Sequence, residues 1–368
     1  MHETPPGAAT ESGCSTMRVC VDGERTHTMT DILDAPELFD TDHTPETVVD
    51  REEELAQLVN AAASQSRNAV LHGPRGSGKT LVTQIALDAA RHDITTCHVS
   101  CLNHDTQYQV LSQLYEQLTG EGIETGYHTA QLQEAVTDRI TDETIVVLDE
   151  VDFLLQNDGN DLLYFLSRLD HDTLSIVLVS ANYEDLSSVL DERTYSTLQP
   201  QAIRFAPYTS NETYRILEAR CRNALARTPF PKEALSYIAM QTANIRFGFH
   251  WIYQAAKAAD DLITEDLARE MREQAVQRYR DVLLADFSPH HSILLEAIEH
   301  LTAERESVHA GAVYDCYKKL ARAIDKDTLT NRRISDFLKH LELLGIIDAN
   351  YYYGGKEGKT REIQFTSI

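Results

Sequence analysis

The sequence lacks the patterns that indicate a metal centre, a disulfide framework or a membrane span. Its six cysteines are scattered along 368 residues, and none belongs to the C-x-x-C pairs that are typical of zinc sites. The patterns H-E-x-x-H and G-x-S-x-G are absent as well, so a metalloprotease or a serine hydrolase has no support. No apolar run approaches the length of about 18 residues that spans a membrane, and residues 1–30 lack the apolar segment of a secretory signal. We therefore expect reduced thiols and a cytoplasmic protein that makes no contact with a membrane.

Lysine is scarce and acidic residues are abundant. The chain has 58 acidic residues against 33 basic ones, of which only nine are lysine, and its formal net charge is −25. Residues 286–368 contain 13 acidic and 11 basic residues, including six of the lysines, and carry a net charge of −2. Residues 1–285 contain the other 45 acidic and 22 basic residues and carry a net charge of −23. A uniformly negative surface would oppose binding to nucleic acid, so the final segment is the part of the chain most suited to it.

One stretch dominates the interpretation of the chain. Residues 73–80 read G-P-R-G-S-G-K-T and match the phosphate-loop pattern G-x-x-x-x-G-K-[ST]. An apolar strand at 68–72 precedes the loop and an amphipathic helix at 81–90 follows it, as this motif requires. Lys79 can reach the β- and γ-phosphates and the Thr80 hydroxyl can hold Mg²⁺, while backbone N–H groups surround the phosphate oxygens. A glycine turn that carries a lysine by chance is the alternative, and both flanking elements argue against it. The candidate nucleotide-binding residues of the loop are Gly73, Gly76, Ser77, Gly78, Lys79 and Thr80.

A second stretch adds catalytic groups to the loop. Residues 145–148 form an apolar run that is typical of a buried parallel strand, and Asp149 and Glu150 follow it. Ligands bind at the carboxyl ends of such strands, so Asp149 can bind Mg²⁺ and Glu150 can polarise the attacking water. Asn182 follows another apolar strand, at 175–179, and can position that water or sense the γ-phosphate. Plain surface carboxylates and a turn asparagine are the alternatives. We predict an ATPase that uses ATP and Mg²⁺.

The order of elements predicts an α/β fold with two further domains. Strands at 68–72, 96–99, 145–148, 175–179 and 202–205 alternate with helices, which indicates a parallel sheet. Four helices without strands follow, at 211–226, 232–242, 248–260 and 264–283. The predicted organisation is a disordered N-terminal tail at 1–43, a P-loop ATPase domain at 44–208, an all-α lid domain at 209–285 and a C-terminal domain at 286–368.

The C-terminal domain has the order of a winged helix. Helices are predicted near 290–301 and 309–323, and a third follows Thr330 as its N-cap; two strands around a glycine-rich turn end the domain. The polar face of the third helix suits a major groove of double-stranded DNA, and basic residues of the hairpin suit phosphate contacts. A protein–protein contact module is the alternative, and the charge distribution favours DNA. The candidate DNA-binding residues are Arg332, Ser335, Lys339, Lys356, Lys359 and Arg361.

The chain resembles the archaeal ORC-type DNA replication initiators, which are AAA+ ATPases, from about residue 44 to 365. The resemblance rests on the ATPase motifs together with TPETVVDREEEL before them and LTNRRISDFLKHLELLGII and GGKEGKTREI at the end. It implies an AAA+ domain in which residues 76–80 bind ATP and Asp149 and Glu150 serve Mg²⁺ and water. It also implies roles for five further residues: the first sensor Asn182, the arginine finger Arg193, the nucleotide contacts Tyr208 and Arg220, and the second sensor Arg246.

The same resemblance implies a biological role. The protein would bind double-stranded origin DNA, help to recruit the replicative helicase and use slow ATP hydrolysis as a switch, with paralogous initiator subunits as possible partners. The alternative is an ATP-gated winged-helix transcription regulator or a signalling NTPase, which the same motifs would fit. The acidic, lysine-poor composition is similar to that of proteins from extreme halophiles, so we expect a haloarchaeal source.

Overall fold

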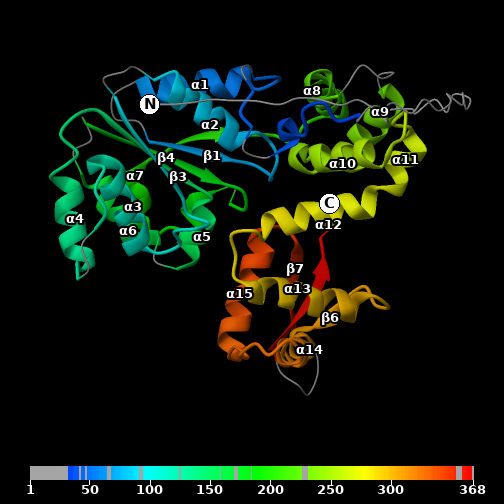
Figure 1. Cartoon of the computed structure of the whole chain (residues 1–368). Coiled ribbons are helices and arrows are strands. Elements are labelled where there is room, and N and C mark those ends of the chain that lie inside the picture. The colour runs from blue at the N-terminus through cyan, green and yellow to red at the C-terminus, as the bar shows by residue number, and fades with distance from the viewer. Residues whose placement is uncertain are drawn as a thin grey trace, which may run out of the picture. The chain divides into compact units, whose positions relative to one another are not determined.

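The computed structural model describes residues 32–40, 43–45, 48–63, 68–90, 94–123, 126–157, 159–169, 173–183, 185–225, 231–353 and 359–366. Residues 1–31, most of the predicted disordered tail, lie outside them. The described residues form a parallel sheet with covering helices, a group of helices without strands and a small domain with an antiparallel sheet (Figure 1). This architecture confirms the predicted fold class, an AAA+ P-loop sheet followed by an all-α lid and a winged helix.

The parallel sheet has five strands in the order β2-β3-β4-β1-β5. The strands are β1 (Ala69–His72), β2 (Thr95–Ser100), β3 (Thr144–Asp149), β4 (Leu174–Ser180) and β5 (Gln201–Arg204). The register places Ser100 beside Asp149, and His72 beside both Ser180 and Arg204. Because every pairing is parallel, the carboxyl ends of the strands meet at one edge, where the predicted catalytic groups are attached.

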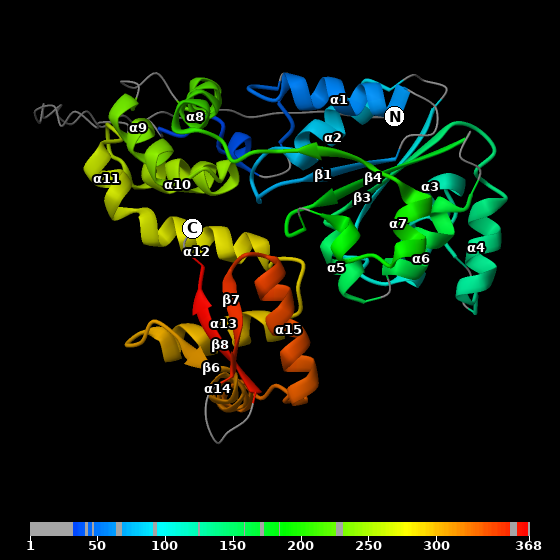
Figure 2. The same cartoon turned by 180° about the vertical axis from the view of Figure 1, so that it is seen from behind.

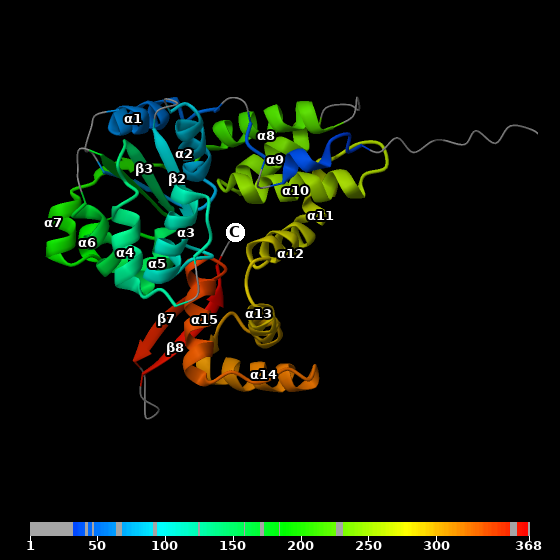
Figure 3. The same cartoon turned by 60° about the vertical axis from the view of Figure 1, so that its left-hand side comes forward.

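Helices cover both faces of this sheet (Figures 1 and 3). Successive residues of β3 point to opposite faces. Ile145 and Val147 pack with α1 and α2, whereas Val146 and Leu148 pack in the core that α3–α7 cover. All six residues of β3 are buried, which explains why its sequence is apolar without alternation. The helices are α1 (Glu52–Ala63), α2 (Lys79–Asp88), α3 (Gln107–Thr119), α4 (Thr129–Thr137), α5 (Val151–Gln156), α6 (Gly159–Ser167) and α7 (Glu192–Leu198), with a 3₁₀ turn at Leu186–Ser188.

The helical lid has its own apolar core around Trp251, whose indole N–H donates to the Ala268 carbonyl oxygen at 2.6 Å. Its helices are α8 (Ser210–Ala224), α9 (Lys232–Gln241), α10 (Ile245–Ala258), α11 (Glu265–Glu270) and α12 (Arg272–Leu283). The last two replace the single helix predicted for 264–283. The chain leaves helical geometry at Met271, with φ −83° and ψ 2°, so the two helices take different directions and both cover the Trp251 core.

The predicted disordered tail is wrong for residues 32–40. A 3₁₀ turn at Pro36–Phe39 packs on the lid, with Ile32 and Phe39 buried in the lid core. The Phe39 ring contacts the rings of Phe249 and Tyr253 edge-on, with centroids 6.4 and 6.3 Å apart. The polar composition of the tail hid this short apolar segment, whose burial offsets the entropy of ordering it.

The C-terminal domain is a winged helix (Figure 2). It comprises α13 (Pro289–Thr302), β6 (Val308–His309), α14 (Ala310–Ala323), α15 (Asn331–Leu343), β7 (Ile347–Tyr353) and β8 (Lys359–Phe365). The strands pair antiparallel in the order β6-β8-β7. Thr330 caps α15 as predicted, because its hydroxyl accepts from the Arg333 amide at 3.4 Å. Strand β6 was not predicted, since two residues are too few to produce a pattern.

Within the described residues, no helix is both long and apolar enough to cross a membrane.

Candidate nucleotide-binding site and DNA-facing helix

The phosphate loop connects β1 to α2 in a conformation that only glycine adopts readily. Gly76 and Gly78 have φ values of 75° and 93°, in the left-handed region. Both also lie against other elements. A Cβ on Gly76 would come within 2.1 Å of the Asn244 side-chain oxygen, and a Cβ on Gly78 within 2.6 Å of the Tyr208 hydroxyl. The two glycines therefore set the turn and let the lid and the end of β5 approach the loop.

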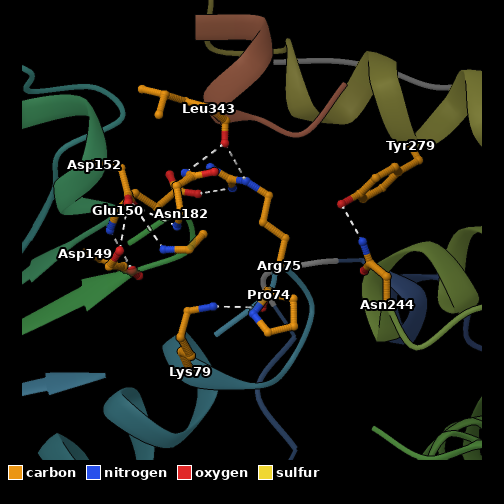
Figure 4. A network of polar contacts seen from close by, with 12 residues as sticks. Pro74, Arg75, Lys79, Asp149, Glu150, Asp152, Asn182, Asn244, Tyr279 and Leu343 are labelled. Carbon is orange, nitrogen blue, oxygen red and sulfur yellow. Dashed lines mark hydrogen bonds and ion pairs between the residues drawn. The ribbon is translucent and has the colours of Figure 1, made fainter. Parts of the chain in front are cut away.

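Lys79 begins α2 and points back into the loop. Its ammonium group donates to the carbonyl oxygens of Gly73 and Pro74 at 2.7 and 2.8 Å (Figure 4). Burial lowers the pKa of Lys79 to about 8, and the charge of Arg75 adds to that effect. Desolvation disfavours the charged form of Lys79. A phosphate anion bound here would stabilise that charged form and raise the pKa again.

Asp149 and Thr80 form a pair of oxygen donors beside this lysine. Asp149 is buried at the end of β3. Burial by itself would raise the pKa of its carboxyl, but the nearby His98 imidazole, the Thr80 hydroxyl and the charge of Arg246 outweigh it and lower the pKa. The carboxyl is therefore ionised at neutral pH. An ionised carboxylate next to a hydroxyl, both on the wall of a cavity, fits the oxygen ligands that Mg²⁺ prefers.

Glu150 is held by an arginine of the phosphate loop. The Arg75 guanidinium pairs with the Glu150 carboxylate at 2.5 Å. The Arg75 Nε donates to the carbonyl oxygen of Leu343, the last residue of α15, at 3.1 Å. Burial alone would lower the pKa of Arg75, but the charge of Glu150 and the hydrogen bond to it raise the pKa. Glu150 itself has a left-handed backbone, with φ 52°, which is uncommon for a residue with a side chain.

Asn182 is fixed by a carboxylate that the sequence analysis missed. Asp152 is fully buried in α5 and accepts from the Ser180 hydroxyl at 2.7 Å and the Ala181 amide at 2.9 Å. It also accepts from the Asn182 amide at 3.1 Å. The exposed Asn182 side chain donates to the Leu343 carbonyl oxygen at 3.2 Å (Figure 4). Asp152 therefore ties the end of β4 to the helix that follows Glu150.

The lid and the segment before α1 complete the site. Asn244 caps α10, accepts from the Phe247 amide and donates to the Tyr279 hydroxyl at 2.9 Å (Figure 4). Arg51 is buried and donates to the Ser77 carbonyl oxygen at 3.0 Å. Its guanidinium also lies 3.9 Å above the ring of Tyr208. The phosphate loop is thereby supported by residues far from it in sequence.

These elements enclose a cavity of about 860 Å³, which falls in the range that binds small molecules. Most of the predicted nucleotide residues line it, namely Gly76, Gly78, Lys79, Thr80, Asp149, Glu150, Tyr208, Arg220 and Arg246. Gly73, Ser77 and Asn182 lie next to that wall without lining it. Arg220 belongs to lid helix α8; it donates to the Leu38 carbonyl oxygen in the 3₁₀ turn Pro36–Phe39 and lies 4.5 Å from the centroid of the Phe249 ring.

Arg193 lies apart from this cavity. It is exposed in the first turn of α7, and its guanidinium rests 3.9 Å above the Tyr164 ring. A finger acts on a neighbouring subunit, so this position agrees with the predicted role without testing it.

The predicted DNA-binding residues differ in how exposed their side chains are. Arg332 is exposed in the first turn of α15. Ser335 and Lys339 follow at spacings that keep them on one helix face, and both are half-buried; Lys339 also pairs with Asp336 at 3.4 Å. Arg361 is half-buried in β8. Lys356 and the side chain of Lys359 lie outside the described residues.

Several site residues escaped the sequence analysis, among them Asn244 of the lid. Arg75 occupies a variable position of the loop pattern, and Tyr279 occupies a helix that looks purely structural. Arg51 lies in the acidic segment TPETVVDREEEL that leads into α1, and Asp152 lies two residues after Glu150. No local pattern marks them, because their contacts join distant parts of the chain.

Two family models match the chain. One, described as CDC6, C terminal winged helix domain, matches residues 283–367, and the other, described as AAA domain, matches residues 62–188.

The chain is similar over most of its length to archaeal replication proteins. The ORC1-type DNA replication protein 1 of Sulfolobus acidocaldarius is 31% identical over 90% of this chain and 89% of the relative. The protein of the same name from Sulfurisphaera tokodaii is 29% identical over 89% and 88%.

Solved structures show the same fold. The Aeropyrum pernix ORC1 protein in complex with DNA has a TM-score of 0.69 at 24% identity and covers 92% of this chain and 95% of its own. The Aeropyrum pernix ORC2 protein in ADPNP and ADP complexes has a TM-score of 0.59 at 21% identity, over 91% and 94%. The similarity to the ORC1-type relatives does not favour a transcription regulator or a signalling NTPase. The chain belongs to the ORC1-type DNA replication proteins, the archaeal ORC/Cdc6 family of AAA+ replication initiators.

Proposed function

We propose that this initiator binds ATP and Mg²⁺ in the cavity around Lys79, binds double-stranded origin DNA through its winged helix, and hydrolyses ATP slowly as a switch. The observation that carries the proposal is the convergence of the phosphate loop, the acidic end of β3 and the lid arginine Arg246 on one cavity of about 860 Å³. Recruitment of the replicative helicase and association with paralogous initiators belong to the same proposal and rest on the family alone.

The phosphates would be held by the loop backbone and by charge. The N–H groups around Gly76 and Gly78 and the start of α2 supply donors and a positive dipole end. Lys79 would leave the two loop carbonyl oxygens for the β- and γ-phosphates. Thr80 and Asp149 would hold Mg²⁺, which offsets phosphate charge when it is bound.

Hydrolysis requires a base for the attacking water, and Glu150 is the candidate. Its Oε1 accepts from Arg75 Nη1 in this structure, and this pair would have to open before the carboxylate turns to the attacking water. This requirement supports slow turnover. Asn182, held by Asp152, would orient the water or the γ-phosphate, and Arg246 would contact the phosphates from the lid.

A second protomer would complete the catalytic centre. Arg193 is exposed and does not line the cavity of its own chain, so we assign it to a neighbour's γ-phosphate. Replacement by Ala should leave the ATP affinity of the monomer intact and lower hydrolysis only where protomers meet on DNA. Loss of ATP binding by the monomer would instead make Arg193 a structural residue.

DNA would be bound by the exposed start of α15 and by the wing. Arg332 heads the polar face that also holds Ser335 and Lys339, and we place this face in the major groove. Lys356, Lys359 and Arg361 of the hairpin would contact backbone phosphates. The near-neutral charge of residues 286–368, against −23 for the rest, supports this assignment.

The test is a titration of the full-length protein against origin and random duplexes, with ATP, with ADP and without nucleotide, across a salt series. We expect tighter binding to origin DNA and dependence on the nucleotide. Binding by a chain that lacks residues 286–368, equal to that of the full chain, would move the DNA contact to the ATPase domain.

A further inference from the structure

Arg75 connects the catalytic glutamate to the winged helix. Its Nη1 pairs with Glu150 at 2.5 Å and its Nε donates to the Leu343 carbonyl oxygen at 3.1 Å. Its Nη2 is buried and has no hydrogen-bond partner within the described part of the chain. One side chain of the phosphate loop thus bridges the end of β3 and the last turn of α15, and it lines the nucleotide cavity as well (Figure 4).

The contact belongs to a wider interface between the ATPase domain and the winged helix. Asn182 donates to the same Leu343 carbonyl oxygen as Arg75. Phe153 of α5 is buried in the apolar core of the winged-helix domain. Its ring lies 6.1 Å from that of Phe287 and 5.8 Å from that of His340, between centroids. The predicted base and the first sensor are therefore both adjacent to a surface on which α15 is docked.

We propose that Arg75 is a positioning residue that restrains Glu150 while the winged helix is docked. A guanidinium that satisfies a carboxylate and a carbonyl oxygen in fixed directions holds both groups in place. Withdrawal of Leu343 removes one of these anchors. Arg75 then reorients, and Glu150 becomes available to water. Movement of α15, the helix assigned to DNA, would in this way set the rate of hydrolysis.

This inference rests on the proposed ATPase function, and it predicts a change in turnover that the ATPase function alone does not. Were Arg75 only a phosphate ligand, its removal would weaken ATP binding and lower turnover. As a restraint on Glu150, its removal raises turnover. The sign of the change in kcat therefore separates the two roles.

The experiment compares Arg75→Ala with wild type in the full-length chain, by steady-state hydrolysis at saturating ATP and Mg²⁺. We expect kcat to rise by roughly tenfold, the factor that one charge-assisted hydrogen bond commonly carries, with the KM for ATP little changed. Arg75→Lys keeps the charge but cannot reach both partners, so kcat should rise less. The matched control is Arg269→Ala, which removes an exposed arginine paired with Glu265 on α11 and should leave kcat unchanged.

A second measurement reports docking without turnover. Hydrogen–deuterium exchange of α5 and the end of α15 should speed up in Arg75→Ala and in Phe153→Leu, which loosens the apolar contact alone. Phe153→Leu should also raise kcat. A fall or no change in kcat for a folded Arg75→Ala, or faster exchange without faster hydrolysis in Phe153→Leu, would overturn the proposal. If wild type neither binds nor hydrolyses ATP, the proposed function fails instead, and the exchange data still report whether Arg75 holds α15.

Discussion

The candidate nucleotide site and the proposed DNA-binding surface differ in burial and in charge. Around the loop, Lys79 and Asp149 are buried; Lys79 donates to carbonyl oxygens of its own loop, and Asp149 lies beside His98 of the neighbouring strand β2. On α15, Arg332 is exposed and belongs to a single helix turn. Charge follows the same division, because residues 1–285 carry −23 and residues 286–368 carry −2. Substitutions in the first region should therefore abolish a function, whereas those in the second should reduce it in steps.

The largest effect is expected for Lys79→Ala. It removes the buried cation that points into the phosphate loop, so ATP affinity should fall by about 100-fold or more, and turnover with it. Fluorescent-nucleotide titration measures the first effect and phosphate release the second. ATP affinity within a few-fold of wild type, in a folded variant, would contradict the assignment of the phosphate site.

Next in size is Glu150→Gln, which keeps the shape of the side chain and removes the base. Turnover should fall by about 10²–10⁴-fold, while ATP binding persists because Lys79 and Asp149 are intact. Single-turnover hydrolysis and nucleotide titration separate the two. Normal turnover would show that another group activates the water.

On the winged helix the expected effect is smaller. Arg332→Ala should reduce discrimination between origin and random DNA by about 1–3 kcal/mol if this residue contacts a guanine edge. Arg361→Ala should weaken binding to all sequences alike and lower the log–log salt slope by about one unit. Competition binding across a salt series measures both. The opposite pattern, with Arg361 selective and Arg332 uniform, would exchange the roles of helix and wing.

The smallest effect concerns pH. Lys79 has a pKa of about 8 in this structure, and a bound phosphate would raise that pKa. Binding is therefore favoured below pH 8, and ATP affinity should fall as pH rises through about 8, by up to tenfold per unit. Calorimetry in buffers of different ionisation enthalpy should show proton uptake on binding near pH 8. No uptake would place a charged Lys79 in the free protein.

The sequence predicted what local patterns determine. The strands, the loop at 73–80 and the N-cap Thr330 have patterns that span a few residues, and the structure has them in place. The bridge from Arg75 to Glu150 and Leu343 could not be predicted. Its partners are far apart in sequence, since Glu150 lies 75 positions and Leu343 lies 268 positions after Arg75. Asp152 escaped for the same reason: its role depends on the backbone of a different strand, which no spacing in its own segment reveals.

Asp152 also connects two strand ends at the edge of the sheet where the predicted catalytic groups lie. Its carboxylate receives three hydrogen bonds from Ser180, Ala181 and Asn182, and it is attached to Glu150 by a single intervening residue. These hydrogen bonds tie the residues after β3 to the end of β4. Loss of the Asp152 carboxylate would remove the acceptor of one hydroxyl and two amides at once, whereas loss of the Ser180 hydroxyl leaves Asp152 with both amides, so position 152 should tolerate substitution less than position 180.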